Sequence, residues 1–265
     1  MICFNNASSI AATLESIHGQ TLRISDLVVV DDGSTDRSAA VARAAGARVV
    51  SHAANLGRGA ARARALSEVC HDVVLGVDAT AVLPADFVES VMPWFHEPCV
   101  AAVCARIDDP QPQGLIRRWR ARHLYRTDAT VAVARKASLI TTGSLLRRSA
   151  VLSVGNFDTG LRHGEDAELG RRLLARGYDV VFDPRVSVIS TARNTLCQVL
   201  ERYWRWNASL GESLSWRAYL KDVAYSIHVM ALHDLRARDP AAMPISLAVP
   251  HYRAWKTWRE GFGRT

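Results

Sequence analysis

Short apolar runs that end in polar turns alternate with segments of helical periodicity along most of the chain. Residues 27–30 form a continuous apolar run that ends at Asp31, and residues 72–77 form a largely apolar run that ends at Asp78. Runs of this length, bounded by turn residues, predict strands buried in a sheet. The same reasoning predicts further strands at residues 48–50, 100–104 and 180–182, and helices after Ser9 and at residues 35–45, 58–69, 84–95 and 164–176.

The alternation of strands with helices predicts the fold class. Elements that alternate at this pace indicate an α/β protein with a mostly parallel sheet and helices on both faces. In such sheets ligands bind at the carboxyl ends of the strands. Asp31, Asp32 and Asp78 are expected at that edge.

The character of the sequence changes near residue 195. Residues 111–137 are rich in arginine and predict a helix with a mobile loop, and from residue 196 onward predicted helices carry Trp204, Trp206 and Trp216. We therefore predict two domains, an α/β domain at residues 1–195 and a helical segment rich in tryptophan and arginine at residues 196–265.

The composition narrows the classes of partner. The net charge is +7, and all but three of the 33 basic residues are arginine. Guanidinium groups suit bidentate phosphate contacts, which favours an anionic partner such as a nucleotide or an anionic lipid. The alternative is a basic surface that serves only solubility. We find no helix-turn-helix, RNP or zinc-finger pattern, so nucleic acid is not a predicted partner.

The cysteines and the apolar stretches bear on the compartment. The five cysteines are scattered and form no CxxC pair, which argues against a disulfide framework and a zinc site. The amino end shows no secretory leader pattern, and the apolar stretches fall short of the roughly 20 residues that span a bilayer. We expect a cytoplasmic protein that, where a membrane is involved, lies on the inner face of the plasma membrane.

Four segments resemble the family-2 glycosyltransferases of the GT-A fold in their order and spacing. They are CFNNASSIAATLESIHGQT, LVVVDDGSTDRS, NLGRGAARARAL and LRHGEDAELGRRLLARGYDVVFDP, and they extend from residue 3 to about residue 185. The resemblance implies a GT-A domain that moves a sugar from a nucleotide diphosphate sugar to a saccharide or lipid-linked acceptor, with inversion. Such a transferase serves polysaccharide biosynthesis.

The resemblance implies a nucleotide-sugar site at Phe4, Asp31, Arg58 and Asp78. Asp31 takes the base-reading role, because a carboxylate can accept the imide N–H of a uracil ring, and this favours a UDP-sugar as donor. Arg58 is placed to reach a phosphate. The alternatives are that the segment around Asp31 only forms a turn, with Ser34 or Asp36 capping the following helix, and that Arg58 is a solvated side chain.

The metal site usual in the family is incomplete here. The family usually has an Asp-x-Asp pair, because a divalent cation that holds a diphosphate prefers carboxylate oxygens. This sequence reads Asp78-Ala79-Thr80, and Ser190 stands where a histidine often completes the site. These two departures argue against Mn²⁺ or Mg²⁺ at Asp78, and an active enzyme would neutralise the leaving group with arginines instead. The candidates are Arg58, Arg147 and Arg205.

Glu165 and Asp166 resemble the acidic pair of the family, in which the aspartate is the general base. Inverting transfer needs a carboxylate that takes the proton of the acceptor hydroxyl. Asp166 matches that position, and Glu165 is assigned to the acceptor or the diphosphate. The alternative is that acids at a helix amino end only complement the helix dipole.

The predicted helices after residue 195 offer two more candidates. Residues 202–206 resemble the Gln-x-x-Arg-Trp acceptor motif, with Arg202 in place of glutamine, and assign Arg205 and Trp206 to the acceptor or the diphosphate. A helix that packs its tryptophans on a core explains the same pattern. The basic and aromatic residues that alternate further on suit a membrane interface or a homodimer contact.

Two points remain open in the sequence. In the family the first strand is central and apolar, whereas only Met1, Ile2 and Cys3 precede Phe4 here, so that either the chain was begun late or this strand is stunted. A degenerate family member that binds nucleotide sugar or glycan without transfer is the main rival function. A nucleotidyltransferase is the second, but the phosphate loop with glycine and lysine that it needs is not found.

Overall fold

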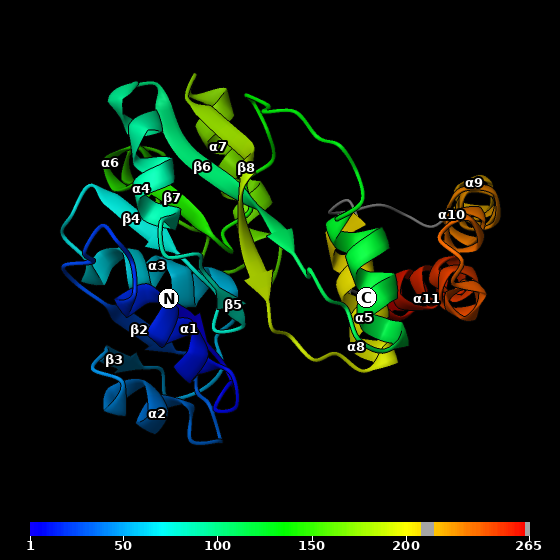
Figure 1. The fold of residues 1–265 in the computed structure, drawn as a ribbon, viewed down its shortest axis with the longest axis horizontal. Helices are drawn as coiled ribbons and strands as arrows, with labels where there is room; N and C mark the ends of the chain where they lie inside the picture. The colour runs from blue at the N-terminus through cyan, green and yellow to red at the C-terminus, as the bar shows by residue number, and fades with distance from the viewer. Residues whose placement is uncertain (208–214, 263–265) are drawn as a thin grey trace. The chain divides into compact units, whose positions relative to one another are not determined.

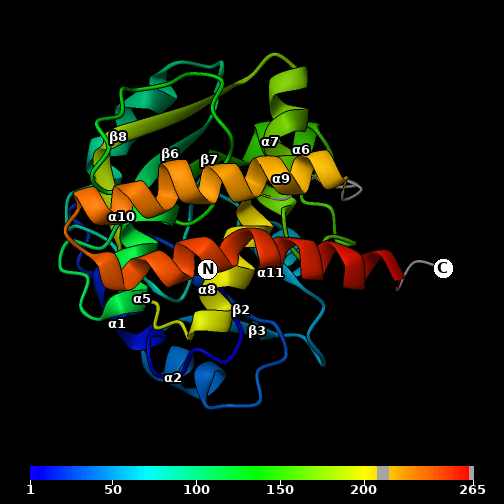
Figure 2. The same ribbon diagram turned by 90° about the vertical axis from the view of Figure 1, so that its right-hand side faces the viewer.

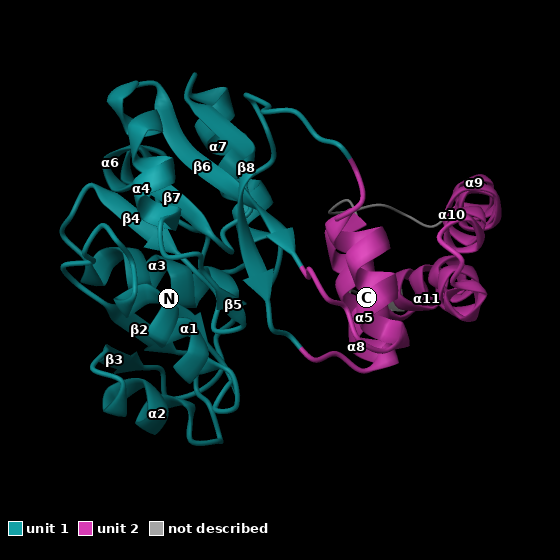
Figure 3. Cartoon of the chain, viewed as in Figure 1, with its two compact units in different colours: residues 1–108, 130–192 teal, residues 109–129, 193–265 magenta. Residues whose placement is uncertain are grey.

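The computed structural model describes residues 1–207 and 215–262. The chain divides into two compact units, one of residues 1–108 and 130–192, and the other of residues 109–129 and 193–265 (Figure 3). The boundary near residue 192 lies close to the predicted one at 195. The arginine-rich segment 109–129, which the sequence placed in the α/β domain, groups with the helical unit instead. Residues 208–214 and 263–265 of the predicted helical segment lie outside the described residues.

The described strands of the first unit form two sheets (Figure 1). The first is parallel and has the order β1-β2-β3. The second has the order β4-β7-β6-β8-β5, in which β6 and β8 are parallel and the other neighbours are antiparallel. The strands are β1 (Ile2–Cys3), β2 (Val28–Asp31), β3 (Arg48–Ser51), β4 (Val73–Gly76), β5 (Ala81–Val82), β6 (Val100–Asp108), β7 (Ser144–Arg147) and β8 (Asp179–Ser190).

Helices cover these sheets and complete the predicted α/β class. Helix α3 packs on β1 and β2, α6 packs on β6 and β7, and α7 packs on β8. The buried faces of α3, α6 and α7 meet the strands in an apolar core that includes Leu66, Leu146, Leu169 and Leu173. The helices of this unit are α1 (Ile10–His18), α2 (Ser38–Ala44), α3 (Arg58–Glu68), α4 (Phe87–Val91), α6 (Arg148–Ser153) and α7 (Glu165–Ala175).

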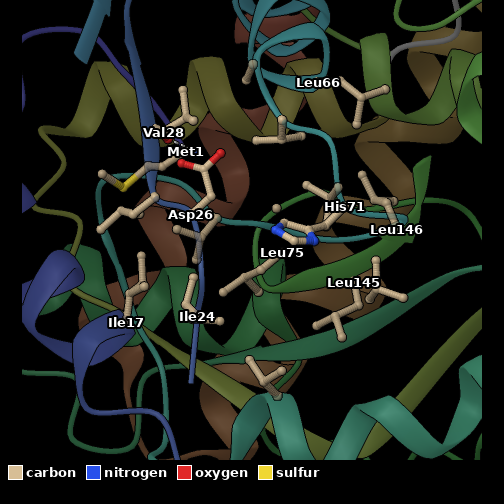
Figure 4. A pocket seen from close by; sticks show the side chains of 18 of the residues that line it. Met1, Ile17, Ile24, Asp26, Val28, Leu66, His71, Leu75, Leu145 and Leu146 are labelled. Atoms are coloured by element: carbon tan, nitrogen blue, oxygen red, sulfur yellow. Dashed lines mark hydrogen bonds between the residues drawn. The ribbon is translucent and has the colours of Figure 1, made fainter. Parts of the chain in front are cut away.

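A cavity of about 390 Å³ separates β2 from β4 in the first unit (Figure 4). Strand β1 has only two residues, and the apolar side chains of Ile17, Val28, Leu75 and Leu146 are among those that line the space beyond it. The α-amino group of Met1 donates a hydrogen bond to the carbonyl oxygen of Val28 at 2.8 Å. Strand β4, expected to be buried, is only half-buried because it borders this cavity.

The second unit is helical, as predicted. Helix α9 continues through the π-helical segment Ser226–Ala231 into α10, and α11 lies alongside (Figure 2). Asp234 is fully buried and holds these helices to α5 and its π-helical extension Ala121–Tyr125, because it accepts hydrogen bonds from Arg122 and Ser246. The helices are α5 (Leu115–Arg120), α8 (Leu196–Asn207), α9 (Trp216–Tyr225), α10 (Leu232–Arg236) and α11 (Met243–Phe262).

Candidate active site

Strand β1 brings two of the predicted site residues to one edge of the first unit. Cys3 pairs with Asp31 in the parallel register with β2, and Ile2 forms a parallel bridge with Asp78 on its other side. Since neighbouring strands are about 4.8 Å apart, the backbones of Asp31 and Asp78 are about 10 Å apart across β1. Both carboxylates therefore lie at the carboxyl edge of the strands, as the sequence predicted.

Asp31 and Asp32 are both buried, but they have different roles in the structure. Asp32 accepts hydrogen bonds from the backbone N–H groups of Leu56 and Gly57 at 3.0 and 2.9 Å, and its Oδ1 lies 2.7 Å from Nδ1 of His52. Asp32 thus fixes the loop before α3. Asp31 accepts only a long hydrogen bond from the thiol of Cys3 within the described chain, at 3.5 Å. Asp31 is therefore the acid that keeps acceptor capacity for a ligand.

Cys3 supports this role of Asp31. Burial, and after it the charge of Asp31, raises the pKa of the Cys3 thiol to about 12. The thiol therefore stays protonated at neutral pH and acts as a donor. A thiol is a weak donor, so the Asp31 carboxylate still has capacity for a stronger one.

Arg62 connects the two acidic parts of the site. Its guanidinium donates to Asp78 and to Glu165, at 2.8 Å in each case. The side chain of Arg62 is only 6% exposed and that of Glu165 only 1%. Burial alone would lower the pKa of Arg62, but the two carboxylates raise it, so the guanidinium stays charged. Arg62, which was not among the predicted site residues, is therefore the cation that joins the two acids.

The periodicity of α3 carried a signal for Arg62 that sequence reasoning missed. Gly59, Ala63 and Leu66 are buried, and Arg62 lies on the same helical face. An arginine on the buried face of a helix requires an acidic partner. Its partners come from 16 and 103 residues away in sequence, so the pattern alone could not identify them.

The acidic pair lies at the amino end of α7, next to Arg62. Gly164 adopts a left-handed conformation, with φ of 75°, and the helix begins at Glu165. Burial, and then the charge of Glu165, raises the pKa of Asp166. The Oε2 atom of Glu165 is buried and has no hydrogen-bond partner among the described residues. A half-buried carboxyl with a raised pKa has the properties of a general base.

Arg58 and Phe4 are both exposed. Arg58 begins α3, and its positive charge acts to lower the pKa of Asp166, which places it within electrostatic reach of the acidic pair. Its guanidinium forms no hydrogen bond or ion pair with the rest of the described chain. The side chain of Phe4 is 45% exposed directly after β1.

The residues present do not fit a divalent cation. Both carboxylate oxygens of Asp78 accept hydrogen bonds, one from Arg62 and the other from Thr142. Ser190, at the position where a histidine was expected, is buried at the end of β8. In the part of the chain that the structure describes, no group of three or more His, Cys, Asp or Glu side chains is arranged to hold a metal.

The three remaining candidates are Arg147 in the first unit and Arg205 and Trp206 in the second. The guanidinium of Arg147 donates to the carbonyl oxygens of Phe95, Glu97 and Val100, so it fastens β7 to the segment before β6. Arg205 pairs with Glu201 on α8 of the second unit. The ring of Trp206 on the same helix is 41% exposed. Arg147 therefore has a structural role, whereas the roles of Arg205 and Trp206 stay predictions.

Taken together, an α/β fold with acids at the strand ends and an acidic pair on a following helix defines the class of GT-A transferases. A solved structure of similar fold is a mannosyltransferase from Pyrobaculum calidifontis in complex with GDP-Man and Mn²⁺, with a TM-score of 0.61, 17% identity, and coverage of 96% of this chain and 86% of that one. The profile of "Glycosyl transferase family 2" matches residues 1–155, and the chain belongs to this family.

Curated relatives agree with this assignment. A pre-mycofactocin glycosyltransferase of Mycobacterium tuberculosis is 29% identical over 201 residues, which are 72% of this chain and 42% of that protein. A poly-beta-1,6-N-acetyl-D-glucosamine synthase of Staphylococcus aureus is 21% identical over 218 residues, which are 78% of this chain and 52% of that protein. The chain spans about half the length of the curated relatives that it matches.

Proposed function

We propose that this protein transfers a sugar from a nucleotide diphosphate sugar, preferably a UDP-sugar, to a saccharide or lipid-linked acceptor with inversion. The proposal is carried by a cluster of one cation and three acids. The buried guanidinium of Arg62 binds Asp78 and Glu165. The third acid, Asp166, is half-buried and has a raised pKa. Family membership supports it independently. The donor sugar and the linkage are set by the loops that shape the pocket, which differ between members.

The donor would lie along the carboxyl edge of the strands. The base is held at Asp31, whose remaining acceptor oxygen suits the imide N–H of uracil. Phe4, exposed directly after β1, offers a ring on which the base can stack. The diphosphate then extends towards Asp78 and α3, where Arg58 presents a cation that makes no other ion pair in the described chain.

Asp166 would act as the general base. Its carboxylate takes the proton of the acceptor hydroxyl as the hydroxyl oxygen attacks the anomeric carbon and the nucleotide diphosphate leaves. The raised pKa of Asp166 increases its basicity, provided the pH is high enough to ionise it. Arg62 holds Glu165 at 2.8 Å, and the charge of Glu165 contributes to the raised pKa of Asp166.

Arginine would supply the positive charge that a metal ion supplies in other members. Arg62 already neutralises Asp78, so the site carries a resident cation where the family usually has a carboxylate pair for Mn²⁺ or Mg²⁺. The charge that develops on the departing diphosphate would be met by Arg58. Any divalent cation in this site would arrive with the nucleotide, and the phosphates would supply most of its ligands.

Calorimetric titration of the protein with UDP, GDP and dTDP, with and without Mn²⁺, tests the donor site. We expect UDP to bind most tightly, and Mn²⁺ to change its affinity by less than about tenfold, since that is the effect of only 1.4 kcal/mol. The variant Thr80→Asp restores the second carboxylate and should make UDP binding depend on Mn²⁺. A wild-type protein that binds no nucleotide would contradict the proposal, and one that needs Mn²⁺ would contradict the role of arginine.

The incomplete metal motif also favours one rival, a member that binds nucleotide sugar or glycan without transferring the sugar. The rival predicts UDP-sugar binding with no transfer to any acceptor of a broad panel. The acidic pair and its ordered partner Arg62 favour the active transferase, because binding alone does not need a raised pKa at Asp166.

A further inference from the structure

Large apolar side chains are exposed along one helix of the second unit. None of the ten residues of α9 is buried. The side chain of Trp216 is 71% exposed, that of Leu220 49%, and that of Ile227, just beyond α9, 45%. Their spacing of four and seven residues places the three side chains on the same face of a helix. We call Trp216, Leu220 and Ile227 the apolar face.

The apolar face belongs to a long, continuous element. Residues 216–236 run through α9, the π-helical segment and α10 without a break, which corresponds to a rod of about 30 Å. Leu235 near its far end is 45% exposed. The neighbouring helix α11 (Figure 2) carries two further exposed tryptophans, Trp255 at 45% and Trp258 at 62%.

The basic side chains of residues 216–236 are more exposed than the acidic ones. Its only two acids, Asp222 and Asp234, are engaged with Arg253 and with Ser246 and His123, respectively. The exposed charges are positive, on Arg217, Lys221 and Arg236. The surface around the apolar face therefore combines apolar rings with a positive charge.

We propose that this surface binds an anionic phospholipid bilayer, with the rod lying in the plane of the membrane interface. Tryptophan suits the headgroup level because its ring is apolar and its N–H is polar. Lysine and arginine beside the apolar face are complementary to anionic lipid headgroups. No helix in the described residues is long and apolar enough to cross a membrane. The inference does not depend on the proposed transferase activity.

Flotation of the protein with vesicles tests the proposal. We expect the protein to float with vesicles of phosphatidylcholine and phosphatidylglycerol, and to float much less with phosphatidylcholine alone. High salt should release it, because screening shortens the range of the attraction to the headgroups. Equal recovery with both kinds of vesicle and without vesicles would overturn the proposal.

Three variants make the test specific. Trp216→Glu with Leu220→Glu should lower vesicle binding at least about tenfold, because two apolar side chains no longer enter the interface. Val131→Glu with Leu152→Glu is the matched control, since these side chains are similarly exposed, at 43% and 40%, on the first unit, and it should bind as the wild type does. Arg217→Gln with Lys221→Gln removes only exposed charge, so it should fold normally and lose the preference for anionic vesicles.

The alternative is that a second copy of this chain covers the apolar face in a dimer, and light scattering of the same proteins distinguishes a dimer from a monomer. A wild type that is a monomer in solution and floats with anionic vesicles supports the proposal. A wild type that is a dimer, that ignores vesicles, and that becomes a monomer with Trp216→Glu and Leu220→Glu would overturn it. Equal loss of flotation in the control variant would also overturn it.

Discussion

At the residue scale, neighbouring acids in this protein have different roles because their partners differ. Asp31 and Asp32 are adjacent and both buried, yet Asp32 is held by two backbone N–H groups whereas Asp31 meets only a thiol in the described chain. Glu165 and Asp166 are also adjacent, and Glu165 is tied to Arg62 whereas Asp166 is half-buried with a raised pKa. In each pair one acid supports the structure and the other is available for a ligand or a proton.

The first prediction separates the two roles at Asp31 and Asp32. Asp31→Ala should fold normally and bind UDP at least about tenfold more weakly, because a charge-assisted hydrogen bond worth about 1.5–3 kcal/mol is lost. Asp32→Ala should lower the free energy of unfolding by roughly 2–4 kcal/mol, because it leaves two backbone N–H groups without their acceptor. Chemical denaturation and calorimetry measure the two effects. Unchanged UDP affinity in folded Asp31→Ala would remove Asp31 from the site.

The second prediction concerns the stability cost of the proposed base. Burial, and then the charge of Glu165, raises the pKa of Asp166. A carboxyl with a raised pKa in the folded state favours folding only below its ordinary pKa, and this contribution is lost as the pH rises through the raised value. Asp166→Asn should therefore raise Tm at neutral pH by roughly 2 °C or more. The gain should vanish below about pH 4, where aspartic acid is neutral in both states.

Glu168→Gln provides the control for this measurement. Glu168 lies in the same first turn of α7, but it pairs with Arg172 at 2.7 Å, so its removal should not raise Tm. If Asp166→Asn is no more stable than the wild type at neutral pH, then the charged carboxylate of Asp166 does not destabilise the folded protein.

At the element scale, the start of α3 is held close to the loop that precedes α7. The N–H of Gly59 donates to the carbonyl oxygen of Leu161 at 3.0 Å. A Cβ atom at Gly59 would lie 2.0 Å from the carbonyl oxygen of Asp158. This close approach brings Arg58 and Arg62 of α3 next to the acidic pair that follows the loop. The site therefore depends on a contact between two backbone segments that only glycine allows.

The third prediction tests this contact. In an exposed helix Gly→Ala is stabilising, but Gly59→Ala should lower the free energy of unfolding by about 1–3 kcal/mol, because the methyl group has no space. Gly19→Ala is the control, since a Cβ atom there would meet its nearest neighbour at 3.4 Å, and its effect should stay within about 0.5 kcal/mol. A neutral Gly59→Ala would show that the two segments separate without cost.

The fourth prediction concerns the short strand β1. In protein produced with Met1 as its first residue, burial, and after it the charge of Arg62, lowers the pKa of the Met1 α-amino group to about 6 from an ordinary value of 8.0. A base with a lowered pKa contributes stability that is present above its unfolded value and is lost as the pH falls through its folded value. The free energy of unfolding should thus rise by roughly 2–3 kcal/mol between about pH 6 and pH 8.

Acetylation of Met1 provides the comparison. The acetylated protein should lose this part of the pH dependence, because an amide carries no charge, and the adjoining cavity of about 390 Å³ has room for the acetyl group. Thermal unfolding of both forms across this pH range measures the difference. Parallel curves for the two forms would show that the amine is solvated in the folded protein.

The sequence predicted those helices and strands whose own residues carry the pattern, without help from distant parts of the chain. The apolar run before Asp31 and the glycine and acids around the start of α7 predicted strand β2 and helix α7. Strand β7 and helix α6 were missed, because the short run Ser144–Arg147 becomes a strand only by pairing with β4 and β6, which are distant in sequence. The same limit applies to Arg62 and Thr142, whose importance appears only when Asp78 lies between them.

At the scale of the whole molecule, the first unit carries the proposed transferase site and the second carries the proposed membrane contact. The family profile covers residues 1–155, so it ends before Glu165 and Asp166, and the proposed base rests on the geometry of the first unit. The second unit carries the exposed apolar face and the predicted Arg205 and Trp206. Because the units fold around separate cores, variants of the apolar face should leave nucleotide binding unchanged.

The measurement that most directly tests the central claim is the rate of sugar transfer by the wild type and by Asp166→Asn. Release of UDP and formation of the glycosylated acceptor are followed together, with UDP affinity measured on the same samples. The account predicts transfer by the wild type, and a loss of about 10²–10⁴-fold in Asp166→Asn with UDP affinity retained, because only the base is removed. Full transfer by Asp166→Asn, or a wild type that binds UDP-sugar and never transfers it to any acceptor, would contradict the account.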